Sequence, residues 1–449
     1  MSALSKLVVP SCLVSILIAS GTSYAAPPAP PFVGGNINIS RDSGVKGEDD
    51  ANPAVAYDPV ENLHLVVWWG DTAATGLNNF EVFGRFVGGM GGDAGPPFRI
   101  SFTGLAEVTE NDPLIARQPD VTYNPSSGEF LVVWYAHVAP GDVEVFGQRV
   151  TPLRTLPGGS FQISNTNVVN PGGNALNPSV TQAGDNGYLV VWQADGTPVD
   201  NEFEIFGRMV GADGSTPSPR FRISTQGTDG DINTEAVEPD VAYRPGANQF
   251  FVVWKGDVSG ADDFEIFGRH IDLTGVPVSG TLPVSFPNPA AGAEHPVVVR
   301  NSTSGELLVA WRENVGSQIL GRMLGTTAKP VGANLQISAP AEAPAVGIGG
   351  PGDNGIGAAY NPVRNEFLVN WPGGGSIKGR VVKGDASLQS PVEDFSTQVG
   401  ERSVDVVYNP NAHEYFTVFD ADGGTNDKVV YGQRRAAPPP VSPPANPTP

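Results

Sequence analysis

Three aspartates in this chain have the type and placement that acid–base chemistry requires. Asp120, Asp240 and Asp405 each stand at the start of a short apolar stretch, in the contexts QPDVTY, EPDVAY and SVDVVY. Glycoside cleavage uses a pair of carboxyl groups, one as the acid and the other as base or nucleophile. The alternative role is structural, because aspartates in such positions also cap loop backbone through hydrogen bonds. The sequence alone favours the structural role.

A second group of oxygen-bearing side chains comprises Asp229, Asp231 and Asn233. They alternate along the chain as in the first part of a calcium-binding loop, and Ca²⁺ prefers several oxygen ligands on flexible segments. Thr234 occupies the position where an EF-hand needs Gly, and no helical pattern flanks the loop. We therefore predict a looser calcium site here, with solvated turn residues as the alternative.

Other catalytic and cofactor chemistry has little support in the sequence. The histidines form no metal-binding motif, and neither a G-x-S-x-G segment nor a phosphate-binding loop occurs. The only cysteine, Cys12, lies in an apolar N-terminal stretch. The five histidines are scattered: His64, His137, His270, His295 and His413. Calcium is therefore the one cofactor that we predict.

The chain is strongly acidic, with 47 acidic against 26 basic residues and a net charge of −21. Such a surface repels phosphate backbones, so nucleic acid is not expected as a partner. It suits a soluble secreted protein or one that collects divalent cations. Long acidic loops, among them residues 104–113, 225–239 and 256–263, are expected to share one face.

The N-terminus has the pattern of a secretory signal peptide. Lys6 precedes an apolar run over residues 7–20, which is short for a membrane span, and small residues at 23 and 25 suggest cleavage after Ala25. We predict a signal peptide over 1–25, a Pro-rich spacer over 26–32 and a disordered Pro-rich tail over 436–449. The mature chain would contain no cysteine, and we expect a secreted, extracellular or periplasmic protein without a membrane span.

These side chains must be positioned by a repeated unit of roughly 60 residues. The phrase FEIFGR occurs at 203–208 and again at 264–269, and looser copies bring its count to seven. The glycines of this phrase are Gly84, Gly147, Gly207, Gly268, Gly321, Gly379 and Gly432. Each unit contains four short, β-branched, apolar runs, around VAY, LVVW, EIFGR and FRIS, bounded by turn residues.

Seven such units predict an all-β, seven-bladed β-propeller with four antiparallel strands per blade. The last unit lacks its fourth strand, whereas NINIS at 36–40 resembles FRIS and precedes the first full unit. An N-terminal strand is therefore expected to complete the last blade, which closes the ring over residues 33–435.

Two sets of recurring side chains are assigned structural roles: the tryptophans pack between blades, and the residue after the FGR glycine forms a hydrogen bond to a neighbouring loop. The tryptophans of LVVW are Trp68, Trp134, Trp192, Trp254, Trp311 and Trp371. The residue after the FGR glycine is Arg85, Gln148, Arg208, Arg269, Arg322, Arg380 or Gln433. Stacking on sugars and carboxylate binding, as in sialidase propellers, are the alternatives for the tryptophans and arginines respectively. Because each set recurs around the whole ring, structural roles are preferred.

The pattern PxVAYNP…LVVW…EIFGR…FxIS resembles the secreted bacterial β-propeller repeat proteins that often occur in long cell-surface polypeptides. The likeness covers nearly the whole mature chain. It implies the propeller fold, and propellers host hydrolases, lyases, lectins and scaffolds alike.

We predict a secreted, non-enzymatic module, acting as a monomer, that binds an extracellular protein or glycan through its acidic loop face. One alternative is a carbohydrate-active hydrolase or lyase with carboxylates near the channel mouth. Another is a structural cell-surface module. The first reading is preferred because Asp120, Asp240 and Asp405 begin non-neighbouring blades, which would place them too far apart for catalysis.

Overall fold

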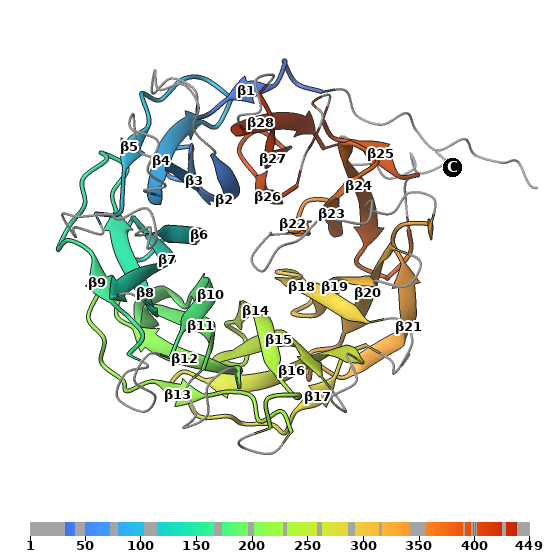
Figure 1. Ribbon diagram of the computed structural model, residues 1–449. Helices are drawn as coiled ribbons and strands as arrows, with labels where there is room; N and C mark the ends of the chain where they lie inside the picture. Colours follow the sequence, from blue (N-terminus) through green and yellow to red (C-terminus); the bar gives the residue numbers. More distant parts are fainter. Residues whose placement is uncertain are drawn as a thin grey trace, which may run out of the picture.

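The computed structural model shows seven four-stranded antiparallel sheets arranged as a ring (Figure 1). The residues that it describes are 32–40, 50–71, 80–102, 115–139, 141–165, 173–195, 202–227, 231–257, 263–285, 292–313, 317–340, 355–388, 391–396, 398, 400, 402–423 and 428–437. The predicted signal peptide, most of the acidic loops, Asp229 and most of the Pro-rich tail lie outside these residues.

The strands follow the chain from the ring centre outward in each blade. Blade 1 contains β2 (Ala51–Asp58), β3 (Leu63–Asp71), β4 (Phe80–Gly88) and β5 (Phe98–Arg99). Blade 2 contains β6 (Ala116–Asn124), β7 (Glu129–Ala139), β8 (Asp142–Val150) and β9 (Phe161–Gln162). Blade 3 contains β10 (Ala175–Gln182), β11 (Tyr188–Ala194), β12 (Glu204–Val210) and β13 (Phe221–Arg222), with the 3-10 turn η2 (Gly184–Asn186) after β10.

The remaining blades repeat this order. Blade 4 contains β14 (Ala236–Arg244), β15 (Gln249–Asp257), β16 (Phe264–Asp272) and β17 (Leu282–Pro283). Blade 5 contains β18 (Ala293–Arg300), β19 (Leu307–Glu313), β20 (Gln318–Leu324) and β21 (Pro330–Gln336). Blade 6 contains β22 (Gly357–Asn361), β23 (Glu366–Gly373), β24 (Ser376–Lys383) and β25 (Glu393–Asp394). Blade 7 contains β26 (Val404–Asn409), β27 (Glu414–Asp422), β28 (Lys428–Ala436) and the N-terminal β1 (Ile37–Asn38).

The predicted ring closure is confirmed. Strand β1 pairs antiparallel with β28, with Ile37 opposite Gly432, so the N-terminal strand supplies the fourth strand of the last blade (Figure 1). Ile39 follows directly and is fully buried in a cluster that includes Trp68, Val418 and Val430. Closure therefore removes an open sheet edge and buries an apolar side chain in the same step.

The tryptophans pack between blades, as predicted. All six are at most 2% exposed, and Trp134 stacks on Phe146 of the neighbouring strand with ring centroids 6.4 Å apart. The glycine after each such Phe permits a close approach. A Cβ on Gly207 would lie 2.9 Å from the Ile223 side chain. These side chains are therefore part of the core and do not form a surface for stacking on sugars.

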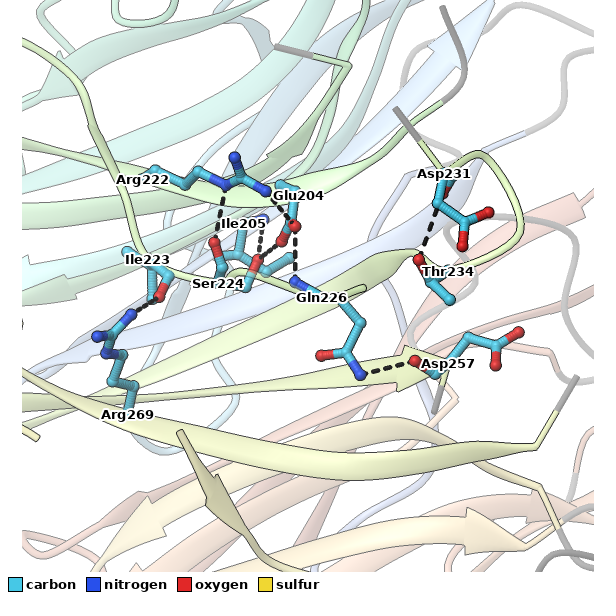
Figure 2. Close-up of polar contacts among 10 residues, drawn as sticks. All are labelled: Glu204, Ile205, Arg222, Ile223, Ser224, Gln226, Asp231, Thr234, Asp257 and Arg269. Atoms are coloured by element: carbon cyan, nitrogen blue, oxygen red, sulfur yellow. Dashed lines mark hydrogen bonds and ion pairs between the residues drawn. The ribbon is translucent and has the colours of Figure 1, made fainter. Parts of the chain in front are cut away.

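In the five blades that have an arginine after the FGR glycine, this side chain connects the blade to the one before it. The Arg208 guanidinium donates to the Ile163 carbonyl oxygen at 2.9 Å, and Arg322 donates to that of Val284 at 3.0 Å. Arg269 donates to the Ile223 carbonyl at 2.7 Å (Figure 2). The predicted structural hydrogen bond is confirmed, and its acceptor is the backbone just after the outermost strand of the preceding blade.

A Glu–Ser contact ties the third strand to the segment after the fourth. In blade 3 the Ser224 hydroxyl and the Arg222 guanidinium donate to the Glu204 carboxylate, while the Ile205 N–H donates to Ser224 Oγ at 2.7 Å (Figure 2). The equivalent backbone-to-serine bond recurs in every blade, with Ser40, Ser101, Ser164, Ser224, Ser285, Ser338 and Ser396 as acceptors. The FRIS serine is thus structural.

Among the described residues, no helix has the length and hydropathy needed to cross a membrane.

Candidate active site

Five consecutive blades begin their innermost strand with the same irregularity. Each has a β-bulge, and inside each bulge one non-glycine residue with positive φ precedes a proline. These residues are Asn52 (φ 51°), Gln118 (52°), Asn177 (51°), Glu238 (55°) and His295 (50°). Left-handed backbone is unfavourable for such side chains, and strain and bulges of this kind gather at functional sites.

A cavity of about 150 Å³ lies where these bulges meet at the ring centre. The three aspartates singled out in the sequence, Asp120, Asp240 and Asp405, all line it. The other lining residues are Ala54, Gln118, Pro119, Asn177, Pro178, Ser179, Glu238, Pro239, His295, Pro296, Val297, Gly355, Ile356 and Val404. The ring therefore gathers into one cavity carboxylates that come from blades 2, 4 and 7.

Each of the three aspartates is anchored on the innermost strand of the next blade. Asp120 Oδ2 accepts a hydrogen bond from the Val180 N–H at 2.8 Å. Asp240 and Asp405 accept equivalent bonds from Val298 at 2.7 Å and Val55 at 2.9 Å. The carboxylates do bind backbone, as the structural alternative proposed, and Asp120 and Asp405 accept a bond from the next residue of their own strand as well as one from the neighbouring strand. These bonds fix the carboxyl groups in place at the cavity wall.

Burial raises the pKa of all three groups, and repulsion from neighbouring carboxylates adds to this effect at Asp120 and Asp405. Burial, with the negative charges of Asp405 and Asp240 nearby, raises the pKa of Asp120 to about 7. Burial and the charge of Asp240 raise the pKa of Asp405 to about 6, and burial also raises that of Asp240. Asp120 is therefore a carboxylic acid that still carries a proton near neutral pH.

Glu238 has the opposite electrostatic environment in the same cavity. Burial opposes its ionisation, but attraction to His295 and Lys255 outweighs burial and lowers its pKa. The Lys255 ammonium lies 3.6 Å from Glu238 Oε1, and His295 Nδ1 lies 3.5 Å from Oε2. The His295 N–H also donates to Oε2 at 2.8 Å. Glu238 therefore ionises at lower pH than Asp120, which lines the same cavity.

Amide and hydroxyl groups orient these carboxylates further. Gln193 Oε1 accepts hydrogen bonds from the Glu238 N–H at 2.9 Å and from the Asn177 side chain at 2.8 Å. The Ser179 hydroxyl donates to Asp240 Oδ1 at 2.9 Å. The site is therefore an ordered polar network.

Sequence reasoning identified the aspartates but missed Glu238 and His295. A signal for both was present, because a polar residue directly precedes proline at the same point of five repeats, in the pairs NP, QP, NP, EP and HP. A residue before proline is normally restricted to extended backbone, so the pattern did not indicate that these side chains enter a bulge.

The predicted calcium ligands lie elsewhere. Asp231 Oδ1 accepts hydrogen bonds from the Asn233 N–H at 3.1 Å and from its side-chain amide at 2.9 Å, and the Thr234 hydroxyl donates to the Asp231 carbonyl (Figure 2). Asp229 lies outside the described residues. Within the part of the chain that the structure describes, no group of three or more His, Cys, Asp or Glu is placed to hold a metal ion.

Comparison with known proteins finds neither a matching family nor a matching curated protein. Solved structures do match. A polysaccharide lyase, an ulvan lyase solved with a bound sugar, shares 9% identity over 90% of this chain and 94% of its own, with a TM-score of 0.51. An α-L-arabinofuranosidase from Fusarium graminearum shares 11% identity over 90% and 98%, with a TM-score of 0.47. A sialidase from Trypanosoma rangeli shares 9% over 91% and 60%, with a TM-score of 0.42. Such identities support the fold alone.

The prediction of a non-enzymatic binding module is wrong. The structural neighbour that matches with a TM-score above 0.5 is a polysaccharide lyase, which agrees with the carbohydrate-active alternative. The physical error lay in the spacing argument. Asp120, Asp240 and Asp405 do begin non-neighbouring blades, yet the innermost strands converge and all three carboxyl groups line one cavity.

Proposed function

We propose that the protein is a carbohydrate-active enzyme that hydrolyses a glycosidic bond in the cavity at the ring centre. The observation that carries this proposal is the pair Asp120 and Glu238, two carboxyl groups in one cavity whose pKa values are shifted in opposite directions. Two such groups with separated pKa values are the acid and base arrangement that glycoside cleavage uses.

The roles follow from the protonation states. Asp120 donates its proton to the glycosidic oxygen as the C–O bond breaks, so the leaving sugar departs as a neutral alcohol. Ionised Glu238 then accepts a proton from the attacking water, or attacks the sugar carbon itself and is released by water in a second step. Lys255 and His295 keep Glu238 ionised, and the backbone bond to Val180 holds Asp120 in position.

Where the protein carries out this activity is proposed from the sequence pattern. The repeat resembles those of secreted bacterial β-propeller proteins, and the N-terminal pattern is that of a signal peptide, which together support action outside the cytoplasm on an extracellular glycan. We also propose that the chain acts as a monomer, because the β1–β28 pairing closes the ring within one chain.

The test is a hydrolysis screen over polysaccharides and oligosaccharides with the intact chain. We expect reducing ends to accumulate on at least one glycan, and we expect Asp120→Asn and Glu238→Gln each to lower kcat by about 10²–10⁴-fold. Asp213→Asn is the matched control, because Asp213 is an exposed turn residue whose carboxylate accepts a hydrogen bond from the Ser215 N–H. Turnover that survives both cavity substitutions would refute the assignment.

A further inference from the structure

The charges that line the cavity select a class of sugar. Resting on the proposed function, we infer that the site accepts a sugar ring that carries no carboxylate or sulfate, so that its substrate ends in a neutral or an amino sugar. Acidic sugars such as uronic and sialic acids are excluded.

The lining is rich in acids and lacks a free cation. Asp120, Glu238, Asp240 and Asp405 all face the cavity, and among the described lining residues there is neither an Arg nor a Lys. Lys255 approaches Glu238 from outside the lining and lies 3.8 Å from Glu294 as well. His295, the one lining group that can become positive, is directed at Glu238. Among the residues that the structure describes, no positive charge is therefore left for a bound anion.

The energetics of a second anion in this cavity are unfavourable. Burying an ionised carboxylate without a paired cation is costly, and like charges at close range repel more strongly where water is largely excluded. A site that places an unpaired charge of the same sign next to a ligand binds that ligand weakly and so discriminates strongly against it. A uronic acid would bring such a charge beside Asp240 and Asp405, which are themselves already repelled by one another.

The lining offers hydrogen-bond partners that match the hydroxyl groups of a neutral sugar. Ionised carboxylates only accept hydrogen bonds, and sugar hydroxyls are the donors that they lack. The lining also offers the amide of Asn177 and the hydroxyl of Ser179, both held by neighbouring residues. An ammonium group on an amino sugar would form charge-assisted bonds to the same carboxylates, which are stronger still.

The size of the cavity restricts how much of a glycan can enter. Its volume of about 150 Å³ matches engineered protein cavities that take up one benzene ring. The cavity therefore has room for about one sugar ring, and we assign that ring to the terminal residue of the glycan.

The test uses binding, so that it does not depend on turnover. The full-length Asp120→Asn variant, which retains an oxygen to accept the Val180 N–H, is titrated at pH 7.5 by calorimetry. The ligands are oligosaccharides that differ only in the terminal sugar, in matched sets such as galactose, galactosamine and galacturonic acid, or glucose, glucosamine and glucuronic acid. We expect the neutral or amino member of at least one set to bind about tenfold or more tightly than its uronic acid.

Equal or tighter binding of the uronic acid members overturns the inference, and so does the absence of binding across all sets. A second substitution, Asp240→Asn, removes one repelling charge from the first variant and should narrow the gap between neutral and acidic ligands several-fold, whereas Asp213→Asn should leave it unchanged. Selective binding without hydrolysis by the wild type would refute the proposed reaction alone. Hydrolysis of glycans that end in acidic sugars would refute the substrate class alone.

Discussion

Asp120 and Glu238 carry the same functional group, yet their neighbours give them different proton affinities. Asp120 is surrounded by two further carboxylates, whereas Glu238 lies between an ammonium and an imidazole. Lys255 comes from the same blade as Glu238 and His295 from the next blade, whereas the carboxylates near Asp120 come from blades 4 and 7. The difference therefore arises from which residues surround each group. One substitution among these neighbours should therefore shift proton affinity without altering the fold.

The pKa of Asp120 makes a prediction about stability. In the folded protein its pKa is about 7, above the ordinary value of 3.8, so the folded state retains a proton that the unfolded chain releases. The stability from this group is therefore present at acid pH and is lost as the pH rises through about 7. Asp120→Asn should raise Tm relative to wild type more at pH 8 than at pH 5.

The control for this measurement is Asp213→Asn. Hydrogen bonds from Ser215 lower the pKa of Asp213, so that carboxyl group is ionised at both pH values and its replacement should change Tm equally. Thermal unfolding of the three proteins at both pH values checks the prediction. A difference between wild type and Asp120→Asn that is independent of pH would contradict it.

The hydrogen bonds between blades can be tested at Arg208. Its guanidinium donates to the carbonyl oxygens of Ile163 and Ser218, so Arg208→Ala should cost about 1.5–3 kcal/mol in the free energy of unfolding. Arg208→Gln should cost less, because blade 2 has Gln148 at this position and its amide donates to the Pro157 carbonyl at 3.2 Å. Urea unfolding measures both, with the exposed Arg402→Ala as control. Equal costs for Ala and Gln would contradict this account.

At the scale of the strand, closure of the ring depends on very few residues. Strand β1 is two residues long, and Ile39 beside it is fully buried. Ile39→Ala should therefore cost about 2–5 kcal/mol, as truncations of buried aliphatic side chains do. Asn38→Ala, at the exposed neighbouring position, should cost far less. If chemical unfolding gives the two variants the same stability, the strand exchange does not support the ring.

The strands, their order and the ring closure could be predicted because the same strand pattern recurs in seven repeats of the sequence. A misread copy is corrected by six others, and the missing fourth strand of the last unit indicates where the N-terminus pairs. The bulges could not be predicted, because a pre-proline residue such as Glu238 normally has extended backbone, whereas its φ in the folded chain is 55°. Thus the aspartates were found, whereas Glu238 and His295 were not.

Calcium at Asp229, Asp231 and Asn233 remains a prediction for the loop before β14. Binding to the folded chain alone would raise Tm by mass action, so we expect a higher Tm in millimolar calcium than in chelator. Asp231→Asn should reduce this increase. If Tm is the same in both buffers, the turn formed by Asp231 and Asn233 needs no ion.

At the scale of the whole molecule, the ring brings together residues that are far apart in the sequence. Asp120, Asp240 and Asp405 belong to separate repeats, yet each lies near the inner end of its blade and lines the central cavity. Radial arrangement brings the equivalent position of all seven blades to one point. The site can therefore vary blade by blade while the packing residues of the repeat stay the same.

The net charge of −21 should disfavour acidic glycans, as the lining of the cavity does. A field of this sign repels polyanionic glycans before they reach the ring centre, and salt weakens that repulsion because the screening length shortens to about 10 Å at 0.1 M. Hydrolysis of a neutral glycan should therefore change little in kcat/KM between 10 mM and 500 mM salt. Any residual turnover of a polyuronate should rise with salt, through faster association. Steady-state kinetics on both substrates across this range provide the measurement. A polyuronate rate that falls as salt is added would indicate a positively charged surface that attracts it, and would contradict the role assigned here to the acidic charge.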